Sequence, residues 1–278
     1  MRDTPVAAVN DKPQHIGEFF DEQGYYLAKS VFSPDSVRAL ERDFDRIVQQ
    51  LEASGEDIDA RWESEYTDEL DGGASRIIHT HNVQRYSAAW LAALQDPRFL
   101  DIAEGLLGPD IILHHSKLFQ KPPREGAPFP VHQDWSYFPT RHDSMIAAII
   151  FLSDADAESG GLCVFPGSHK LGRMDNSAGR SVGDSESASL NSSAELAAKY
   201  PLEDGLAINA KPGDVVFFSY LTLHGSTPDR SDKNRKTVLV QLYGGNDHVI
   251  EDGGDNHVNE RLVLRGWNHQ MQRGEAGS

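Results

Sequence analysis

Three runs of strand-forming sequence in the second half of this chain constrain its fold more than any other feature. The run from Met145 to Leu152 is apolar throughout, and those from Asp214 to Ser219 and from Arg235 to Tyr243 are rich in β-branched and aromatic residues. Residues of this kind favour strands, and a short apolar run between turn residues is typical of a strand buried in a sheet. The pattern therefore predicts a core built from β-sheet.

The first half of the chain has a different pattern, with apolar residues at helical spacing. The predicted helices are Gln14–Gln23, Pro34–Leu51, Ala88–Leu94 and Pro97–Leu107. Glycine follows the first and the last of them, as is common where a helix ends. We therefore expect a helical support on the N-terminal side of the β core.

With 278 residues, the chain is long enough to bury a full core as one domain. We expect a single domain over 1–278, made of a mainly helical support over 13–108, an all-β core over 109–245 and a polar C-terminal tail over 246–278 with one helical patch near Val258–Leu264. The segment 173–205 interrupts the β core with small and polar residues. It is either a lid over a functional site or a tolerated surface insertion, because long loops in compact domains are often lids or irregular segments.

Charge and cysteine content narrow the functional classes. The formal net charge of −17 argues against binding to nucleic acid or to anionic membrane surfaces. A single cysteine, Cys163, cannot form an intrachain disulfide and fits a reducing compartment. The first residues are too polar for a signal peptide, and no apolar run approaches the length of a membrane span. We expect a cytoplasmic protein whose partner is a small molecule, with no nucleic acid and no membrane involved.

Two histidines and one aspartate are the main candidates for chemistry. His132 and Asp134 lie two positions apart in an extended run entered through Pro130, and strand residues two apart point to the same face. Gln133 would then point to the other side, and His224 follows strand-forming sequence much later in the chain. Two imidazoles and one carboxylate can cap one face of an Fe(II) ion and leave the opposite face open, as in non-heme iron oxygenases.

An arginine eleven positions after His224 extends this motif. The polar turn from Pro228 to Asn234 predicts a hairpin centred near Asp229–Arg230, which would bring Arg235 beside His224 or Ser226. A guanidinium group is planar, always charged and able to bind a carboxylate through two hydrogen bonds. Arg235 is therefore a candidate for holding the far carboxylate of a 2-oxo acid that chelates the metal.

A family resemblance rests on several blocks that follow one another in order along the chain. They are Gly24–Leu27, His115–Pro123, His132–Pro139, Gly160–His169, Pro212–Phe217, and His224–Ser226 with Arg235. With these blocks the chain resembles the phytanoyl-CoA dioxygenase family, whose members are Fe(II)- and 2-oxoglutarate-dependent oxygenases on a double-stranded β-helix, or jelly-roll, core. The resemblance covers nearly the whole chain, and it specifies the family rather than a substrate.

The resemblance implies a role for individual positions. The implied catalytic Fe(II) ligands are His132, Asp134 and His224, and the implied co-substrate residues are Arg235, Ser226, Lys117 and Gln133. Asn82 departs from the family, some of whose members have a lysine near the co-substrate there. Trp135 and Tyr137 are either ordinary apolar packing or part of a substrate wall. His114 and His115 would point to opposite faces of a strand.

The implied reaction uses Fe(II), 2-oxoglutarate and O2 to hydroxylate or otherwise oxidise an unactivated C–H bond of a small organic metabolite, with release of succinate and CO2. Asp134 favours hydroxylation, because related halogenases have a small residue in its place. Two alternatives stay open: a cupin-type non-oxidative metalloenzyme such as an isomerase, which would not need Arg235, and a non-catalytic binding protein on the same fold. An acyl-CoA, a free amino acid and a natural-product intermediate are all possible substrates.

Overall fold

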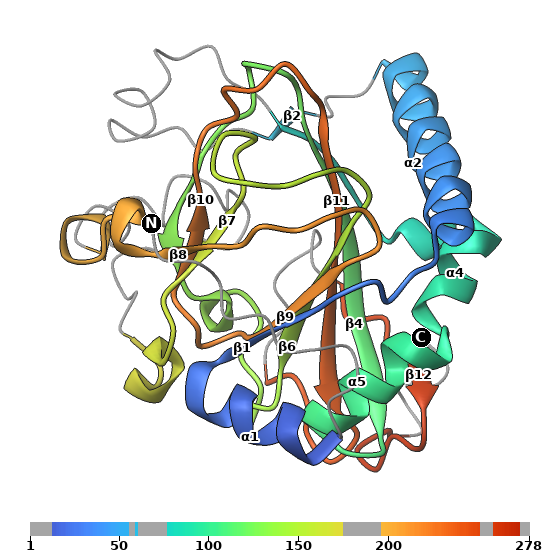
Figure 1. Cartoon of the computed structure of the whole chain (residues 1–278). Coiled ribbons are helices and arrows are strands. Elements are labelled where there is room, and N and C mark those ends of the chain that lie inside the picture. Colours follow the sequence, from blue (N-terminus) through green and yellow to red (C-terminus); the bar gives the residue numbers. More distant parts are fainter. Residues whose placement is uncertain (1–12, 56–58, 61–76, 175–195, 251–257, 273–278) are drawn as a thin grey trace.

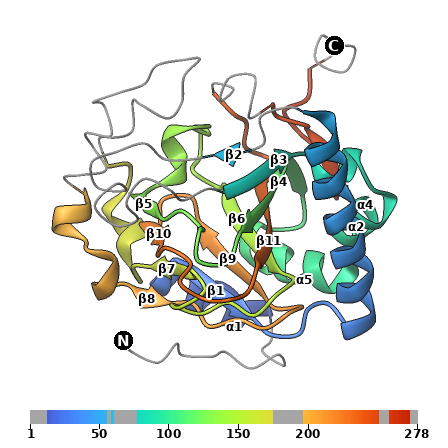
Figure 2. The ribbon, with the colours of Figure 1, turned by 90° about the horizontal axis from the view of Figure 1, so that it is seen from above.

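The computed structural model describes residues 13–55, 59–60, 77–174, 196–250 and 258–272. Two antiparallel sheets lie face to face, and helices cover the outer face of the larger sheet (Figure 1). The same order of layers is visible from above, with the smaller sheet on one side of the larger sheet and the helices on the other (Figure 2). The predicted jelly-roll core with a helical support is confirmed.

The three predicted strand runs are adjacent strands in the middle of the larger sheet, and they are confirmed. This eight-stranded sheet has the order β1 (Tyr25–Ala28), β9 (Val215–Ser219), β6 (Ile146–Phe151), β11 (Arg235–Gly244), β4 (Ile111–Lys121), β3 (Ile77–His81) and β2 (Asp59–Ala60), and β12 (Leu262–Arg265) pairs with β4. The four-stranded sheet has the order β5 (Phe129–His132), β10 (His224–Ser226), β7 (Leu162–Val164) and β8 (Leu206–Ala207).

The four predicted helices are also confirmed. They are α1 (Pro13–Gln23), α2 (Pro34–Ser54), α4 (Ala88–Leu94) and α5 (Pro97–Leu107). The described residues also form short 3-10 helices, which are η1 (Val83–Arg85), η2 (Asp134–Ser136), η3 (Ser168–Leu171) and η4 (Leu202–Asp204). The longest helix, α2, begins after Ser33, whose hydroxyl accepts a hydrogen bond from the backbone N–H of Ser36. It ends at Gly55, whose φ of 74° is the left-handed conformation common at helix ends.

The β6 strand shows how the larger sheet uses its two faces. Ile146, Ala148 and Ile150 pack with the helices, whereas Ala147 and Phe151 belong to the apolar cluster between the two sheets. Alternate residues of a strand point to opposite faces, and here both faces are buried. This double burial explains why the run is apolar throughout.

The predicted hairpin between His224 and Arg235 is wrong. The β10 strand pairs with β5 and β7 in the smaller sheet, whereas β11 lies between β4 and β6 in the larger one. The chain over 227–234 therefore crosses from one sheet to the other. Burial gives the physical reason, because β11 is buried along most of its length and needs neighbours on both edges.

The C-terminal tail also differs from the prediction, since β12 replaces the expected helical patch near Val258–Leu264. It pairs with Ile111–Leu113 of β4, whereas β3 pairs only with Lys117–Gln120 of the same strand. An open strand edge readily accepts another strand. Pairing with the open part of β4 therefore outweighs the local sequence preference for a helix. The region expected to be mainly helical likewise contributes the short strands β1, β2 and β3 to the larger sheet.

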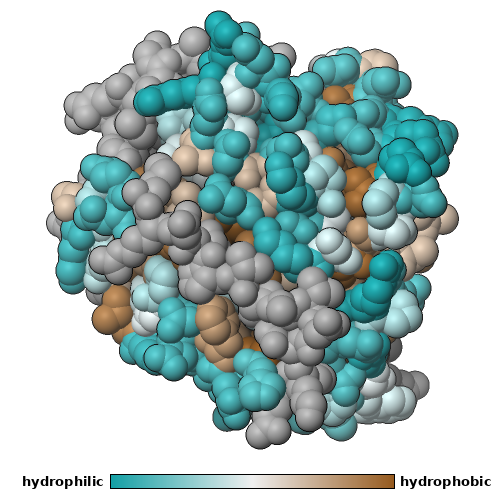
Figure 3. All heavy atoms as spheres, in the orientation of Figure 1, coloured by the Kyte–Doolittle hydropathy of each residue, from teal (hydrophilic) through white to brown (hydrophobic). Residues whose placement is uncertain are grey.

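Hydrophilic side chains cover most of the described surface on the face shown in Figure 3, and apolar side chains show mainly in small areas between them. Cys163 is a buried free cysteine. Within the described residues, no helix is both long and apolar enough to span a membrane. Most of the segment 173–205 lies outside the described residues, which resume at 196 with a helical stretch over 196–199.

Candidate metal and co-substrate site

Strands β4 and β11 carry four pairs of side chains on their inner face, toward the smaller sheet. The register pairs Lys121 with Arg235, Phe119 with Thr237, Lys117 with Leu239 and His115 with Gln241. Seven of these eight residues line a single pocket between the sheets, and Lys121 lies just behind its wall. Strand alternation therefore builds one side of the site from two neighbouring strands.

A register shift overturns the expectation that two adjacent histidines point to opposite faces. Between Gln241 and Leu242 the pairing skips one residue of β4, so that His114 is the extra residue of a β-bulge. The Nδ1 atoms of His114 and His115 lie 2.6 Å apart, and both rings pack against Phe138. The bulge thus puts both histidines on the inner face of the sheet.

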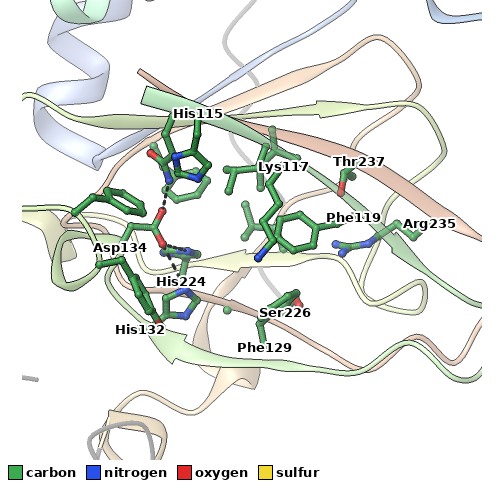
Figure 4. Close-up of a pocket in the computed structure, with 18 residues that line it drawn as sticks. His115, Lys117, Phe119, Phe129, His132, Asp134, His224, Ser226, Arg235 and Thr237 are labelled. Carbon is green, nitrogen blue, oxygen red and sulfur yellow. Dashed lines mark hydrogen bonds and ion pairs between the residues drawn. The ribbon is translucent and has the colours of Figure 1, made fainter. Parts of the chain in front are cut away.

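His132, Asp134 and His224 come together at one side of the pocket (Figure 4). His132 ends β5 and lies opposite His224 of β10 in the register, with ring centroids 4.3 Å apart. The Nε2 atom of each histidine lies 3.5 Å from Oδ1 of Asp134. Asp134 was expected on the same strand as His132, but it begins η2 instead, because the chain turns directly after Gln133.

Both histidines have their outer ring nitrogen fixed by a backbone carbonyl. Nδ1 of His132 donates to the carbonyl of Pro130 at 2.7 Å, and Nδ1 of His224 donates to that of Thr222 at 2.9 Å. A carbonyl oxygen can only accept, so the proton of each neutral ring lies on Nδ1. Nε2 of each ring then presents its lone pair toward the carboxylate side, as metal-binding histidines do.

The carboxylate of Asp134 is held ionised and oriented. Burial by itself would raise its pKa, but in the metal-free site the charge and the Nε2–H hydrogen bonds that His224 and His132 supply when protonated outweigh burial and hold the pKa well below its usual range. Nε2 of Gln241 donates to Oδ2 at 2.7 Å, which leaves Oδ1 on the side of the histidines. Gln241 was not among the predicted residues, although it lies on the same face of β11 as Arg235 and is polar within a buried strand.

Arg235 lies on the other side of the pocket from these three residues, facing Ser226 of the smaller sheet (Figure 4). Its side chain is buried, and its Nε has no hydrogen-bond partner in the described structure. Burial lowers the pKa of Arg235 to about 10, so the group is charged at neutral pH. A buried charge is costly unless it is paired, and this arrangement therefore suits an anionic ligand.

Lys121 is a second residue that the sequence did not single out. It is fully buried, and its Nζ donates to Oγ of Ser226 at 2.7 Å and to the carbonyls of Gly160 and Thr227. An ammonium group only donates, so Oγ of Ser226 accepts here and its own hydrogen remains available for a carboxylate oxygen. Burial and then the charge of Arg235 lower the pKa of Lys121 well below its usual value.

Gln133 does not line the pocket, so its position gives no support to the expectation that it binds the co-substrate. Its Nε2 donates to the carbonyls of Gly172 and Leu221, and its Oε1 accepts the indole N–H of Trp135. The alternation that turns His132 into the pocket turns Gln133 away from it. Trp135, one of the two expected substrate residues, lies outside the pocket lining as well.

Lys117 and Tyr137 do line the pocket, whereas Asn82 does not. The ammonium of Lys117 lies 5.0 Å from the ring centroid of Phe119 and points into the pocket (Figure 4). Much of the remaining lining is apolar, from Phe119, Phe129, Phe138, Ile149, Leu162, Phe218 and Leu239. The pocket thus combines an apolar wall with one cluster of metal-type ligands and two cationic side chains.

The donor set fits a divalent transition metal. One ligand atom from each of His132, Asp134 and His224 lies within 4.8 Å of the other two, and no other group of this kind occurs in the described part of the chain. Two imidazoles and a carboxylate on one side suit non-heme Fe(II), since they leave positions open for other ligands. The buried cation of Arg235 across the same pocket suits a chelating acid whose second carboxylate extends away from the metal.

Comparison with known proteins agrees with this arrangement. The family model described as phytanoyl-CoA dioxygenase (PhyH) matches residues 20–237. A protein of Stutzerimonas stutzeri named as a probable alpha-ketoglutarate-dependent hypophosphite dioxygenase is 28% identical over 250 residues, which covers 90% of this chain and 84% of that protein. An ectoine dioxygenase of Stutzerimonas stutzeri strain A1501 is 28% identical over 266 residues, covering 90% of this chain and 81% of its own.

Solved structures share the fold. The non-heme alpha-ketoglutarate-dependent carbocyclase SnoK from nogalamycin biosynthesis superposes with a TM-score of 0.69 at 20% identity, covering 94% of this chain and 98% of its own. EctD from S. alaskensis, in its apo form, superposes with a TM-score of 0.67 at 23% identity, covering 94% of this chain and 89% of its own.

Proposed function

This chain belongs to the phytanoyl-CoA dioxygenase family, and from that premise we propose that His132, Asp134 and His224 hold its Fe(II) ion while Arg235 and Ser226 hold 2-oxoglutarate. The protein is an Fe(II)- and 2-oxoglutarate-dependent dioxygenase that acts on a small organic molecule with O2. The observation that supports the residue assignment most strongly is the convergence of the three ligand atoms within 4.8 Å, across one pocket from the buried Arg235.

When bound, Fe(II) and 2-oxoglutarate together activate O2 for the oxidation of a C–H bond, with release of succinate and CO2. The protein's own residues position these components. The carbonyls of Pro130 and Thr222 fix the histidine rings, and Gln241 holds one oxygen of Asp134 so that the other faces the metal position. Such outer contacts orient metal ligands and tune their affinity.

The other end of the co-substrate is held by charge and by directed hydrogen bonds. Arg235 offers a planar fork to the distal carboxylate, and Ser226 offers the hydroxyl hydrogen that Lys121 leaves available. The apolar residues of the pocket wall exclude water from this end, which strengthens each electrostatic contact there. Together these residues would hold the co-substrate between Arg235 and the three metal-type ligands.

The substrate is proposed to be a small metabolite bound beside Tyr137 and Phe138, which line the pocket on the side of the metal ligands. The relatives are named for hypophosphite, ectoine and phytanoyl-CoA, which are chemically unlike one another. Their names therefore do not select a substrate for this chain. A cytoplasmic location belongs to the same proposal, supported by the single buried cysteine and by the stability of Fe(II) in a reducing compartment.

Succinate release tests the proposed residues. Purified protein supplied with Fe(II), 2-oxoglutarate, ascorbate and air is expected to form succinate slowly without substrate and faster with a substrate found by screening. Asp134→Ala should abolish this, and Arg235→Ala should retain metal but lose the co-substrate. Unchanged succinate release in Arg235→Ala would contradict the assignment of Arg235 to the co-substrate, and a complete lack of succinate across a broad panel would favour a non-oxidative cupin-type enzyme or a binding protein.

A further inference from the structure

Gln133 lies between His132 and Asp134 in the sequence, yet it does not line the pocket that these two residues share. Its side chain is completely buried. A buried amide is costly unless its donors and acceptors find partners. The partners that this amide has chosen therefore indicate what the residue does at this position.

All four hydrogen-bonding positions of the Gln133 amide are used. Nε2 donates to the carbonyl of Leu221 at 2.6 Å and to that of Gly172 at 3.0 Å. Oε1 accepts the indole N–H of Trp135 at 2.8 Å and the backbone N–H of Met174 at 2.9 Å. Carbonyls only accept and N–H groups only donate, so these partners fix the orientation of the amide.

These contacts join the segments that carry the three metal-type ligands. Trp135 follows Asp134 directly, and Leu221 lies three residues before His224. The backbone N–H of Trp135 also donates to the carbonyl of Tyr220, at 3.2 Å. The turn that carries Asp134 is therefore bound to the chain that leads into His224.

Arg173 holds the same turn on the side away from the pocket. Its guanidinium lies 5.3 Å from the centroid of the Trp135 ring, and its Nε donates to the carboxylate of Asp143 at 2.9 Å. The hydroxyl of Tyr220 donates to the same carboxylate. The hydrogen bonds around the turn therefore form a closed network, with the Gln133 amide at its buried end.

Of the three metal-type ligands, the aspartate depends most on this network. Strand pairing sets His132 opposite His224, whereas Asp134 begins η2 and has no strand partner in the described register (Figure 4). We infer that Gln133 is a positioning residue, whose amide holds the Asp134 turn against the chain before His224 so that the carboxylate meets both imidazoles. This rests on the proposed function, because it takes these three residues as the metal ligands.

Co(II) is a suitable probe, because its visible absorption bands report the geometry of its ligands and it binds the same kinds of ligand as Fe(II). Gln133→Met should weaken Co(II) and anaerobic Fe(II) binding about 10- to 100-fold and alter the Co(II) bands. Trp135→Phe keeps the ring but loses one of the four contacts, and it should cause a smaller loss of metal affinity in the same direction.

Gln84→Met is the matched control. The Gln84 amide also bonds through both of its ends, but its described contacts, with Asn82, Ser116 and Glu260, lie outside the segments that carry the metal-type ligands. This variant should lower the unfolding temperature of the metal-free protein, because buried hydrogen bonds are lost. Its Co(II) bands should not change, and its metal affinity should stay within about threefold of that of the unmodified protein.

Unchanged Co(II) bands and metal affinity in Gln133→Met would overturn the inference. Equal losses of metal affinity in Gln133→Met and Gln84→Met would do so too, since Gln133 would then only stabilise the fold. If Gln133→Met does not fold, Trp135→Phe and Gln133→Glu, which keeps the acceptor but loses the donors, decide by the same two readouts. Failure of the proposed function is distinct, because the unmodified protein would then bind no Co(II), or would bind it equally well in Asp134→Ala.

Discussion

Replacing Arg235 with lysine tests how the distal carboxylate of 2-oxoglutarate is held. The variant keeps a cation but loses one arm of the planar fork, and a hydrogen bond to a charged group contributes about 1.5–3 kcal/mol. Because each 1.4 kcal/mol is tenfold in affinity, 2-oxoglutarate should bind about 10- to 150-fold more weakly at neutral pH. Fe(II) affinity should not change, because Arg235 lies across the pocket from the ligands.

The same variant has a predicted pH signature. At this buried position the pKa of Arg235 is lowered to about 10, and burial and the neighbouring charge lower that of its cross-strand partner Lys121 well below 10.5. A lysine at 235 would share these influences from a lower starting value. Its charged form would then be lost as pH rises, so the affinity of the variant for 2-oxoglutarate should fall with rising pH above neutrality while that of the unmodified protein stays level.

The assay is an anaerobic titration of the Fe(II)-loaded protein with 2-oxoglutarate at several pH values, with metal binding measured separately. Lys236→Arg is the matched control, because Lys236 is the next residue of β11 but points outward to Glu41 and Asp45 of α2. The reasoning would be refuted if Arg235→Lys lost less than about threefold in affinity for 2-oxoglutarate, or if this affinity varied with pH as it does in the control.

Three further predictions concern buried polar contacts. Gln241→Met removes the donor to Asp134 and should weaken Fe(II) binding about 10- to 100-fold, measured by competition with a metal chelator, and unchanged binding would contradict the orienting role. Lys121→Met should raise the KM for 2-oxoglutarate more than it changes kcat, because Ser226 loses the donor that orients its hydroxyl; an effect on kcat alone would count against this. Asp247 is buried, and its pKa is lowered because hydrogen bonds from Ser144 and neighbouring groups outweigh burial. Asp247→Asn should therefore cost about 1–3 kcal/mol of unfolding free energy above pH 4, and this difference should shrink as pH falls through the lowered pKa. Denaturation at several pH values measures it, and a difference that stays constant with pH would show that the carboxylate charge is irrelevant.

Local patterns predicted the elements of this fold well. The helix Pro97–Leu107 has the predicted bounds, and the apolar run from Met145 to Leu152 contains β6. Both follow from residue spacing and turn residues within a short window. Which strands become neighbours depends on burial over the whole sheet, and for this reason the expected hairpin between β10 and β11 was wrong.

In the candidate site, too, the local sequence predicted some residues, whereas others depend on contacts between distant parts of the chain. The motif spacing identified His132, Asp134 and His224, and the structure brings them together. It could not reveal Gln241, whose importance comes from its hydrogen bond to Asp134, a residue more than a hundred positions earlier in the chain. Nor could it assign the inner face to both His114 and His115, because a single extra residue in β4 reverses the alternation. Contacts that depend on strand register need the structure.

The most direct test of the central assignment is an anaerobic spectroscopic titration of the metal-free protein, first with Fe(II) and then with 2-oxoglutarate. A weak visible charge-transfer band should form only when both are present, and it should be lost in Asp134→Ala, whose carboxylate would otherwise complete the ligand set with His132 and His224. If Fe(II) binds with its expected affinity but no band forms on adding 2-oxoglutarate, the co-substrate does not chelate this metal, and the assignment of the pocket is contradicted.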